Sequence, residues 1–211
     1  MGRSRGEQTV ETKPRKMAPN LDIEQIVEAA WKLVDRDGVD ALSTRALAAE
    51  LNVRGPALYW HVRNKQQLLS LMIERVLGAS IVAQPPGLGW QEWLRTVCRN
   101  QRRVLLEHRD SGRIASSIPP TERTRTEVFP QMFEPLTRAG FPREQAIAAA
   151  GALASFLLGH VIYEQRPETR EFVSSMVDLD AAFEFGLDAF IAGFAVKLTE
   201  LAAKAPRADK E

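Results

Sequence analysis

The stretch STRALAAELNVRGPALYWHVRNK, residues 43–65, decides the fold, because its spacing is that of two short helices joined by a tight turn. Four apolar side chains are spaced to form a small shared core: Leu47, Leu51, Val53 and Leu58. Ala48 is small where the two helices approach closely, and Asn52 stands at the turn, where a residue tolerant of left-handed backbone is required. The stretch predicts a helix-turn-helix, with helices over Thr44–Leu51 and from Pro56 to about His61.

Flanking signals extend the helical pattern on both sides. Three polar residues are expected helix N-caps: Asp22, Ser43 and Asn64. Asp22 is followed three residues later by Gln25, as in a capping box, and Gly38 is in the position where a first helix would end. A fourth helix is predicted over Lys65–Leu77, and the proline- and glycine-rich stretch Gly78–Gly89 reads as a connection.

Beyond this connection the apolar residues keep the helical period, and no stretch shows the sustained alternation of a strand. The expected helices are Trp90–Glu107, Thr121–Arg138, Pro142–Gln165 and Leu179–Lys204. Pro130 and Pro135 lie inside the second of these, so that helix is expected to be kinked or broken. The predicted fold class is therefore all-α.

Composition limits what the chain can be. Its 211 residues are 45% apolar, enough for a buried core, and 28 basic side chains balance 27 acidic ones. A near-neutral chain does not coat nucleic acid or membrane indiscriminately, so any DNA binding has to be local. The single cysteine, Cys98, excludes an intramolecular disulfide and any zinc site built from several cysteines, which fits a reducing cytoplasm.

No targeting segment is expected. The N-terminus lacks the apolar core of a signal peptide, and no uninterrupted apolar run reaches the ~18 residues of a membrane span. Residues 1–20 carry five basic side chains and little to bury: Arg3, Arg5, Lys13, Arg15 and Lys16. We expect a cytoplasmic protein without membrane association and a disordered basic arm over 1–20, either a plain flexible terminus or an arm that touches DNA.

The charge pattern of the helix-turn-helix suits DNA. Residues 51–73 include Arg54, Arg63 and Lys65 but no acidic side chain, so phosphates would meet no local repulsion. The expected phosphate contacts are Thr44, Tyr59, His61 and Lys65. The helix that begins near Gly55 would face the major groove, where base contacts are expected from Arg45 and Arg54 to guanine and from Pro56 and Ala57 to thymine methyl groups.

Two alternatives stay open at this stage. Trp60 could pack inside the protein or touch DNA. The whole stretch could instead be an ordinary capped helix pair, in which Tyr59, Trp60 and His61 form an aromatic anchor in a core.

The segment LSTRALAAELNVRGPALYWHVRNKQQLL, residues 42–69, resembles the DNA-binding domain of the tetracycline-repressor (TetR) family, and LYWHVRNK is the most specific part of the match. GWQEWLRTVCRNQRRVLLEHRD at 89–110, PPTE at 119–122 and the run from Gly140 to Gln165 resemble the C-terminal core of the same family. The resemblance covers about residues 21–166.

This resemblance implies a helix-turn-helix domain over 21–66, a connecting helix and linker over 67–89, and an effector-binding and dimerisation domain over 90–211. It also implies a homodimer held by a four-helix bundle, to which each subunit contributes Pro142–Gln165 and Leu179–Lys204. The small side chains from Ala148 to Ala154 would permit close helix approach at that interface, or equally within one subunit. The implied function is a transcriptional repressor that binds operator DNA and is released by a small-molecule effector.

In the tetracycline repressors the drug arrives as a magnesium chelate, but the matching positions differ here. Ala115 stands at the metal-binding histidine, Ile118 and Pro119 at the polar pair that follows, Val97 at the drug-binding asparagine and Tyr163 at the acidic residue. Without these ligands neither a metal nor tetracycline is expected. The expected lining suits a largely apolar effector: Val97, Gln101, Ala115, Ile118, Val128, Gln131, Met132, Ala150 and Ala154. For each residue singly, ordinary core packing is the competing interpretation.

An enzyme is not expected. The three histidines, His61, His108 and His160, are widely separated, and Cys98 lies among apolar helix positions, so all four read as structural. No phosphate-binding glycine loop or nucleophile elbow is present. Two rival functions are a helical small-molecule enzyme with an inert helix-turn-helix and an architectural DNA-binding protein without an effector.

Overall fold

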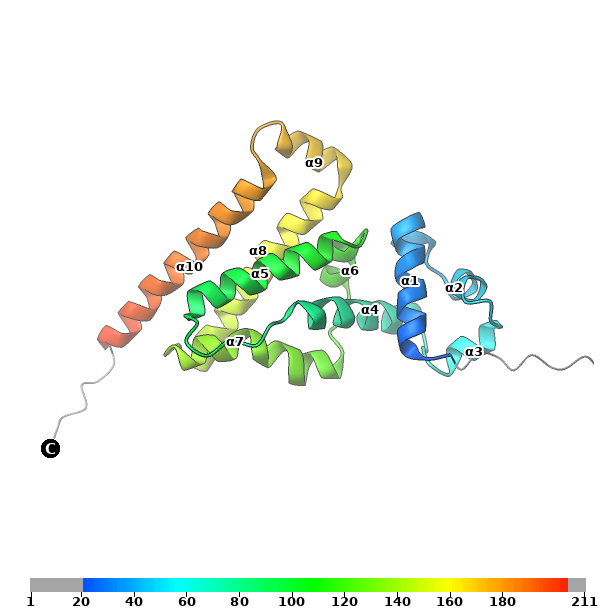
Figure 1. Ribbon diagram of the computed structural model, residues 1–211, viewed down its shortest axis with the longest axis horizontal. Helices are drawn as coiled ribbons and strands as arrows, with labels where there is room; N and C mark the ends of the chain where they lie inside the picture. The colour runs from blue at the N-terminus through cyan, green and yellow to red at the C-terminus, as the bar shows by residue number, and fades with distance from the viewer. Residues whose placement is uncertain (1–20, 205–211) are drawn as a thin grey trace, which may run out of the picture.

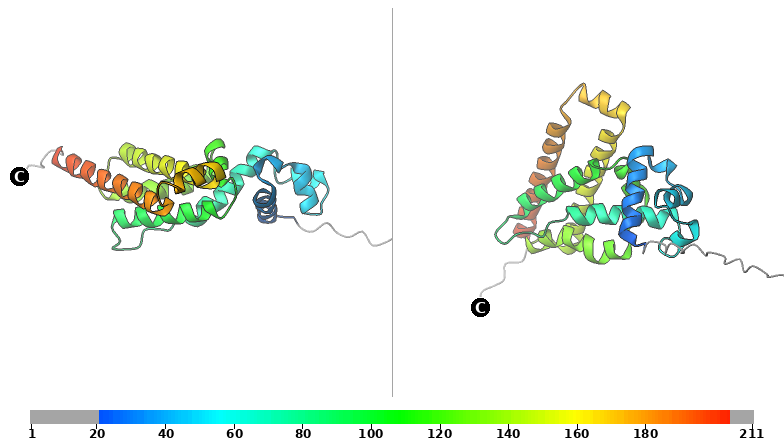
Figure 2. Two further views of the ribbon diagram at one scale, coloured as in Figure 1. Left: turned by 90° about the horizontal axis from the view of Figure 1, so that it is seen from above. Right: turned by 45° about the vertical axis from the view of Figure 1, so that its right-hand side comes forward.

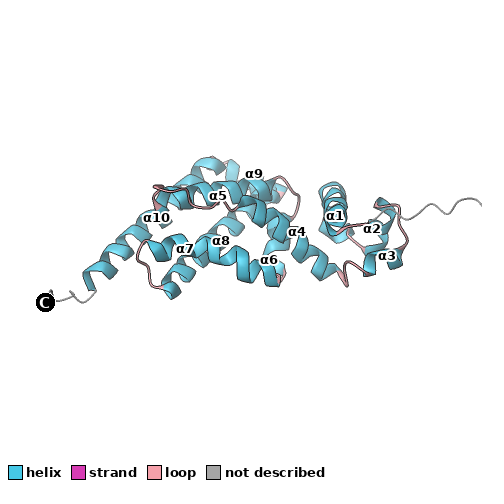
Figure 3. Ribbon diagram, turned by 60° about the horizontal axis from the view of Figure 1, so that its bottom comes forward, coloured by secondary structure: helices cyan, strands magenta, loops and turns pink. Residues whose placement is uncertain are grey.

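The computed structural model describes residues 21–204, and within that range it contains helices and loops but no strand (Figure 3). The all-α prediction is confirmed. The predicted basic arm, 1–20, lies outside the described residues. Seen from above, the helix-turn-helix and the last helix stand at opposite ends of an elongated molecule (Figure 2).

The N-terminal half contains α1 (Ile23–Asp37), the short 3₁₀ helix η1 (Val39–Ala41), α2 (Thr44–Glu50) and α3 (Gly55–Tyr59). These elements cluster at one side of the molecule, and α4 (Lys65–Ser80) leads from them into the remainder (Figure 1). The helix-turn-helix therefore forms one end of the molecule, and α4 connects it to the remaining helices.

The expected caps set these helices. The Asp22 carboxylate accepts a hydrogen bond from the backbone N–H of Gln25 at 2.8 Å. The side-chain carbonyl of Gln25 accepts one from the backbone N–H of Asp22 at 3.2 Å. Such a cap stabilises a helix by about 1 kcal/mol. Gly38 ends α1 with a φ of 84°, a backbone conformation that other residues rarely adopt. The capping box and the glycine stop are both confirmed.

The turn between α2 and α3 has the predicted chemistry. Asn52 has a φ of 53°, so the expectation of a left-handed residue there is confirmed. Leu47 and Leu58 are each only 1% exposed, and Leu51 and Val53 pack against them as half-buried neighbours. The helix α3 is shorter than predicted, because it begins at Gly55 and ends at Tyr59, and His61 follows it in a turn.

The described part of the C-terminal half contains six α-helices, of which α6 and α9 are short. Their bounds are α5 (Trp90–Leu106), α6 (Ser111–Ser117), α7 (Phe129–Arg138), α8 (Arg143–Gln165), α9 (Pro167–Ser174) and α10 (Leu179–Lys204), with a π-helical stretch, η2 (Thr124–Val128), before α7. The predicted helices over 90–107, 142–165 and 179–204 are confirmed to within a residue or two.

One helix boundary was wrong, two helices were missed, and the expected break within 121–138 was confirmed. The fourth helix continues through Gly78 to Ser80, so the connection begins at Ile81. Helices α6 and α9 were not predicted at all. The expected break in 121–138 occurs as the π-helical stretch before Pro130, whose ring nitrogen has no N–H to donate, whereas Pro135 lies inside α7.

A close crossing joins α8 and α10, which run antiparallel in Figure 1. A Cβ atom at Gly186 would lie 2.6 Å from the ring of Phe156, so a larger residue there would force this ring to move. That ring also stacks on Phe183, with centroids 5.6 Å apart.

Ion pairs hold α10 against α5. Arg95 pairs with Asp188 at 2.8 Å and Arg99 with Glu184 at 2.7 Å. Arg102 bonds both oxygens of Glu164 in α8 at 2.8 Å and also reaches Asp180 at 2.5 Å. We call these contacts the α5–α10 ion ladder, and it fixes the register of the last helix.

The helix α8 is the one helix among residues 21–204 that is long and apolar enough to cross a membrane, by length and composition alone. Polar Ser155 and His160 interrupt its apolar run. Only 28% of its most apolar window is buried within the chain. Its apolar side chains therefore divide between the core, where Leu153 and Leu157 lie, and an exposed face that includes Ile147.

Candidate DNA-binding surface and effector cavity

The ten residues expected to contact DNA lie on α2, on α3 and its N-cap, in the turn after α3 and at the first residue of α4. Seven are exposed: Arg45, Arg54, Pro56, Tyr59, Trp60, His61 and Lys65. The other three, Thr44, Gly55 and Ala57, are half-buried. Arg45 is on α2 rather than at the start of α3, so only Arg54 and the residues after it share the beginning of the helix expected to enter the groove.

The aromatic residues of this region do not anchor a core. Tyr59 is 58% exposed and Trp60 is 89% exposed, whereas their neighbours Leu58 and Val62 are buried. Among residues 21–204, therefore, Trp60 does not pack into the core. A fully buried tryptophan is a large source of stability, so exposing one indicates a surface built to contact something else.

Lys65 has a structural contact that the sequence did not indicate. Its ammonium group donates to the backbone carbonyl of Val39 at 2.8 Å and so ties the start of α4 to η1. An ammonium has three donors, so two stay available for a phosphate. Asn64, immediately before it, caps α4 by accepting from the Gln67 N–H at 2.8 Å.

Five of the nine residues expected to line an effector site share one cavity: Val97, Gln101, Met132, Ala150 and Ala154. They come from α5, α7 and α8. Four further side chains that sequence reasoning missed complete the lining: Trp93, Leu94, Cys98 and Leu153. We call this space the effector cavity. Its volume is about 10 Å³, so it is almost closed.

The other four expected residues lie elsewhere. Val128 is buried beside a different cleft, next to α1 and α4. Gln131 is exposed and donates to the Glu127 carbonyl at 2.8 Å. Ala115 on α6 and Ile118 after it are half-buried against the core, outside the effector cavity.

The missed residues follow from helical geometry. Trp93 and Cys98 stand four residues before and one residue after Val97, on the face of α5 that the core covers. Burial raises the pKa of the Cys98 thiol to about 12. Gln101 is 4% exposed, and its side chain lines the effector cavity. The amide is the polar group of an otherwise apolar lining.

Polar contacts join the helix-turn-helix domain to the corner between α5 and α6. The Asp35 carboxylate accepts from the Arg109 N–H at 2.9 Å and lies 3.0 Å from His108 Nδ1. Asp110, with a φ of 59°, accepts from the Val39 N–H at 2.9 Å. The His108 ring stacks on Trp31, with centroids 4.1 Å apart. His108 thus has the structural role expected of it.

A second set of contacts ties α4 to the stretch before α7. The Ser70 hydroxyl donates to the Pro119 carbonyl at 3.0 Å. The Glu74 carboxylate accepts a hydrogen bond from Thr121 and pairs with Arg123 at 3.5 Å. These contacts connect the segment before α7 to α4, and α4 leads to the helix-turn-helix.

Metal ligands do not gather anywhere in the described part of the chain, where no three His, Cys, Asp or Glu side chains could hold an ion together. His160 lies 3.1 Å from the Leu179 carbonyl oxygen and 3.5 Å from Glu164. These contacts give it a structural role in joining α8 to α10.

A capped helix-turn-helix with exposed basic and aromatic side chains, carried on a helical domain with a central apolar cavity, defines a DNA-binding transcriptional regulator. Two family models match: residues 26–72 match the bacterial regulatory proteins of the tetR family, and 83–175 match the tetracyclin repressor-like C-terminal domain. The chain belongs to the TetR family. It is a ligand-responsive DNA-binding repressor, and regulators of this family are soluble proteins.

Individual relatives agree over nearly their full lengths. The class D tetracycline repressor of Escherichia coli is 33% identical over 202 residues, covering 86% of this chain and 92% of the relative. A TetR variant of Acinetobacter baumannii AYE, solved in complex with minocycline, superimposes with a TM-score of 0.75 at 33% identity, covering 85% of this chain and 99% of its own.

A third relative, BioQ of Mycobacterium smegmatis, has a TM-score of 0.72 at 31% identity, covering 84% of this chain and 99% of its own. BioQ has also been solved with its natural double-stranded DNA operator. That structure matches with a TM-score of 0.65 at 30% identity, covering 84% of this chain and 99% of its own.

Proposed function

We propose that this repressor acts as a cytoplasmic homodimer that leaves its operator when a small, largely apolar organic molecule enters the effector cavity. The observation that carries the proposal is the convergence of Val97, Met132, Ala150 and Ala154 around the buried amide of Gln101. An apolar wall with one amide suits a ligand with an apolar body and a few polar groups.

The near closure of the cavity supports a mechanism. About 10 Å³ admits no organic molecule, so a ligand has to separate α7 from α5 and α8. A ligand that binds only the open arrangement shifts the population toward it. Because η2 and α7 are tied to α4 through Glu74 and Ser70, the shift reaches the helix-turn-helix and changes the spacing of the two α3 helices in the dimer.

The DNA contacts follow from the exposed surface. Tyr59, His61, Lys65 and Thr44 hold phosphates, and Arg54 with Arg45 reads guanine edges. Pro56 and Ala57 meet thymine methyl groups, with Gly55 allowing close approach of the backbone. Trp60 belongs to the same surface, because its ring is 89% exposed among the residues that the structure describes.

The dimer forms through α8 and α10. Both helices expose large apolar side chains that a monomer would leave in water: Ile147, Phe185 and Val196. A second copy of the same face would cover them, as in the four-helix bundles of the family. The small residues Ala148 and Gly151 are exposed on the same helix, which favours the intersubunit role over internal packing.

Tetracycline is excluded from the proposal, although relatives bear its name. Ala115 offers a methyl group and Val97 an isopropyl group at the positions of an imidazole and an amide. Unsatisfied buried polar groups cost roughly 1 to 3 kcal/mol each, so two such losses lower affinity by a factor on the order of ten to ten thousand.

The test measures release of a labelled operator, first identified by selection from genomic fragments. Apolar-to-mixed organic compounds should release the wild-type protein, and magnesium with tetracycline should not. Gln101→Leu should weaken release by the compounds that carry polar groups, because the buried amide is lost. Gln131→Leu is the matched control, since that amide is exposed on α7.

Equal release in the Gln101→Leu and wild-type proteins would remove the effector cavity from the mechanism. Release by magnesium-tetracycline at sub-micromolar concentration would show that other residues hold the drug.

A further inference from the structure

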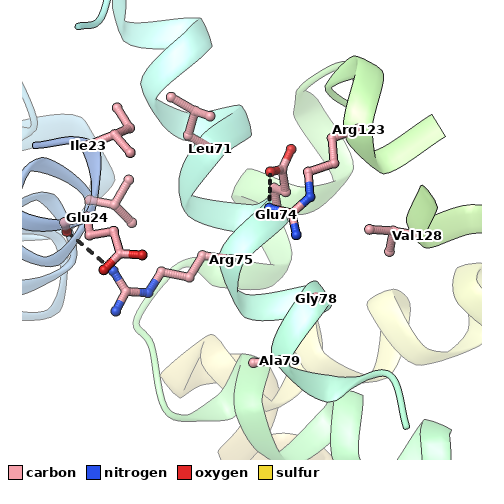
Figure 4. Close-up of a pocket in the computed structure, with 10 residues that line it drawn as sticks. Ile23, Glu24, Leu71, Glu74, Arg75, Gly78, Ala79, Arg123 and Val128 are labelled. Carbon is pink, nitrogen blue, oxygen red and sulfur yellow. Dashed lines mark hydrogen bonds and ion pairs between the residues drawn. The ribbon is translucent and has the colours of Figure 1, made fainter. Parts of the chain in front are cut away.

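A second cavity opens between the two domains, and Figure 4 shows the residues that line it. We call it the junction cleft. It lies between α1, α4 and η2, and its volume is about 310 Å³. Its apolar walls are Ile23 and Val27 of α1, Leu71 of α4 and Val128 of η2. This volume is at the lower end of the range for small-molecule sites, so the cleft holds an organic body without rearrangement.

Charged side chains form the rim of the junction cleft. Glu74 is already satisfied, because Thr121 donates to its carboxylate and Arg123 pairs with it, and its side chain is only 12% exposed. Arg123 is satisfied in turn by Glu74 and by Glu127 at 3.1 Å. Neither of these charges needs a ligand.

Arg75 is different. Its guanidinium makes one hydrogen bond, at 3.3 Å to the backbone carbonyl of Glu24. Within residues 21–204 no carboxylate lies at ion-pair distance from it, although its charge, after that of Lys32, helps to lower the pKa of Glu28. A guanidinium has five N–H donors in a planar fork that fits a carboxylate. The Glu24 carboxylate stands at the same rim on the exposed first turn of α1, so it opposes a bound anion only through solvent.

We propose that the junction cleft is a second small-molecule site and that it binds an amphipathic monocarboxylate. The carboxylate lies on Arg75, and the apolar chain packs between Ile23, Val27, Leu71 and Val128. Such a ligand touches α1 in the DNA-binding domain and η2 in the effector domain, so its affinity depends on how the two domains sit. By linkage, the ligand changes the affinity for DNA by the same factor by which DNA changes the affinity for the ligand.

The chain also offers a way to block the cleft. Gly78 lines it, and a Cβ atom built there would meet nothing within 4 Å. Gly78→Phe therefore fills the cleft from α4 without a backbone clash, and it removes a helix-interior glycine.

The experiment titrates the full-length protein by calorimetry with octanoate, octylamine and octanol, which share one chain length. Octanoate should bind most tightly. Arg75→Gln should weaken octanoate binding on the order of tenfold or more, through loss of a charge-assisted pair. Glu24→Gln should strengthen it about twofold to fivefold, through loss of an exposed opposing charge.

Arg125→Gln is the matched control, because Arg125 is also exposed and donates only to a backbone carbonyl, that of Pro120, outside the cleft. It should leave octanoate binding unchanged. Gly78→Phe should abolish binding, and octanoate should change the DNA affinity of the wild-type protein but not that of Gly78→Phe.

Four outcomes overturn the proposal. They are the absence of octanoate binding at millimolar concentration, equal binding of octylamine, octanoate binding that Arg75→Gln leaves unchanged, and saturation of the cleft without any change in DNA affinity. The Arg75→Gln and Glu24→Gln variants keep the test decisive even where Gly78→Phe lowers stability, because both replace charges at exposed positions.

Discussion

At the scale of the residue, Lys65 has two roles that a single substitution would confound. Its ammonium holds the Val39 carbonyl and also faces outward at the start of α4, where DNA phosphates are expected. Tyr59, the last residue of α3, is exposed and has no such structural bond. Comparing the two separates a loss of DNA contact from a loss of domain stability.

We predict that Tyr59→Phe and Lys65→Met both weaken binding to operator and to nonspecific DNA. Lys65→Met should also reduce the slope of log affinity against log salt concentration by about one, because one phosphate contact loses its charge. Tyr59→Phe should leave that slope unchanged. Fluorescence anisotropy at several salt concentrations measures both quantities, and thermal unfolding of each variant serves as the control.

An unchanged salt slope in Lys65→Met, together with a lower melting temperature, would assign Lys65 to the Val39 contact alone.

The residues that define the helix-turn-helix could be predicted because each acts locally. A cap, a left-handed turn and a core leucine all depend on neighbours within four positions, so Asp22, Asn52 and Leu47 were identified without tertiary information. Gln131 was expected to line the effector site, but it is exposed on α7. The helical period does not fix which way a residue of α7 faces once a π-helical stretch has shifted the register before it.

At the scale of the element, the α5–α10 ion ladder sets where the last helix lies. Its arginines lie on one face of α5, and their partners Asp180, Glu184 and Asp188 repeat every four residues along α10. The hydrogen bond from Arg99, with its charge, holds the pKa of Glu184 below its ordinary value.

The lowered pKa predicts how pH affects this contact. A carboxyl group whose pKa is depressed by folding adds stability above its unfolded pKa and loses it as pH falls through the folded pKa. At neutral pH, Glu184→Gln should lower the free energy of unfolding by about 0.5 to 1 kcal/mol, because the pair is partly exposed. The difference from wild type should vanish in strong acid.

Chemical denaturation at fixed protein concentration and several pH values measures this difference. Glu200→Gln is the control, since Glu200 is on the same helix but pairs only with Lys197, within α10. A pH-independent loss in Glu184→Gln would mean that packing, and not charge, holds the two helices.

The two helices absent from the sequence-based prediction were missed for different reasons. The helix α9 buries no side chain, so it has no apolar face whose period could reveal it. The helix α6 follows Asp110, whose left-handed backbone is stabilised by a bond to Val39 that is distant in sequence. Tertiary contacts of this kind leave no local signal.

At the scale of the whole molecule, the exposed apolar face of α8 and α10 requires a partner. Phe185 is 79% exposed in the single chain. We predict that Phe185→Glu yields a monomer, because a charge buried in the dimer would be unpaired. Phe185→Leu should stay dimeric, since leucine keeps the face apolar. Sedimentation equilibrium at micromolar concentration measures the mass of each.

A wild-type monomer at that concentration, or a Phe185→Glu dimer, would place the interface elsewhere.

The reactivity of the Cys98 thiol can report how often the effector cavity opens. It is the single thiol of the chain, it lies in the wall of the effector cavity, and both its burial and its raised pKa keep it from reacting while that wall is closed. The rate at which an alkylating reagent consumes the thiol therefore counts how often α7 moves away from α5. Under the proposed mechanism operator DNA favours the closed arrangement, so it should slow that rate. A reagent that reacts at once with the DNA-bound dimer would contradict the closed cavity.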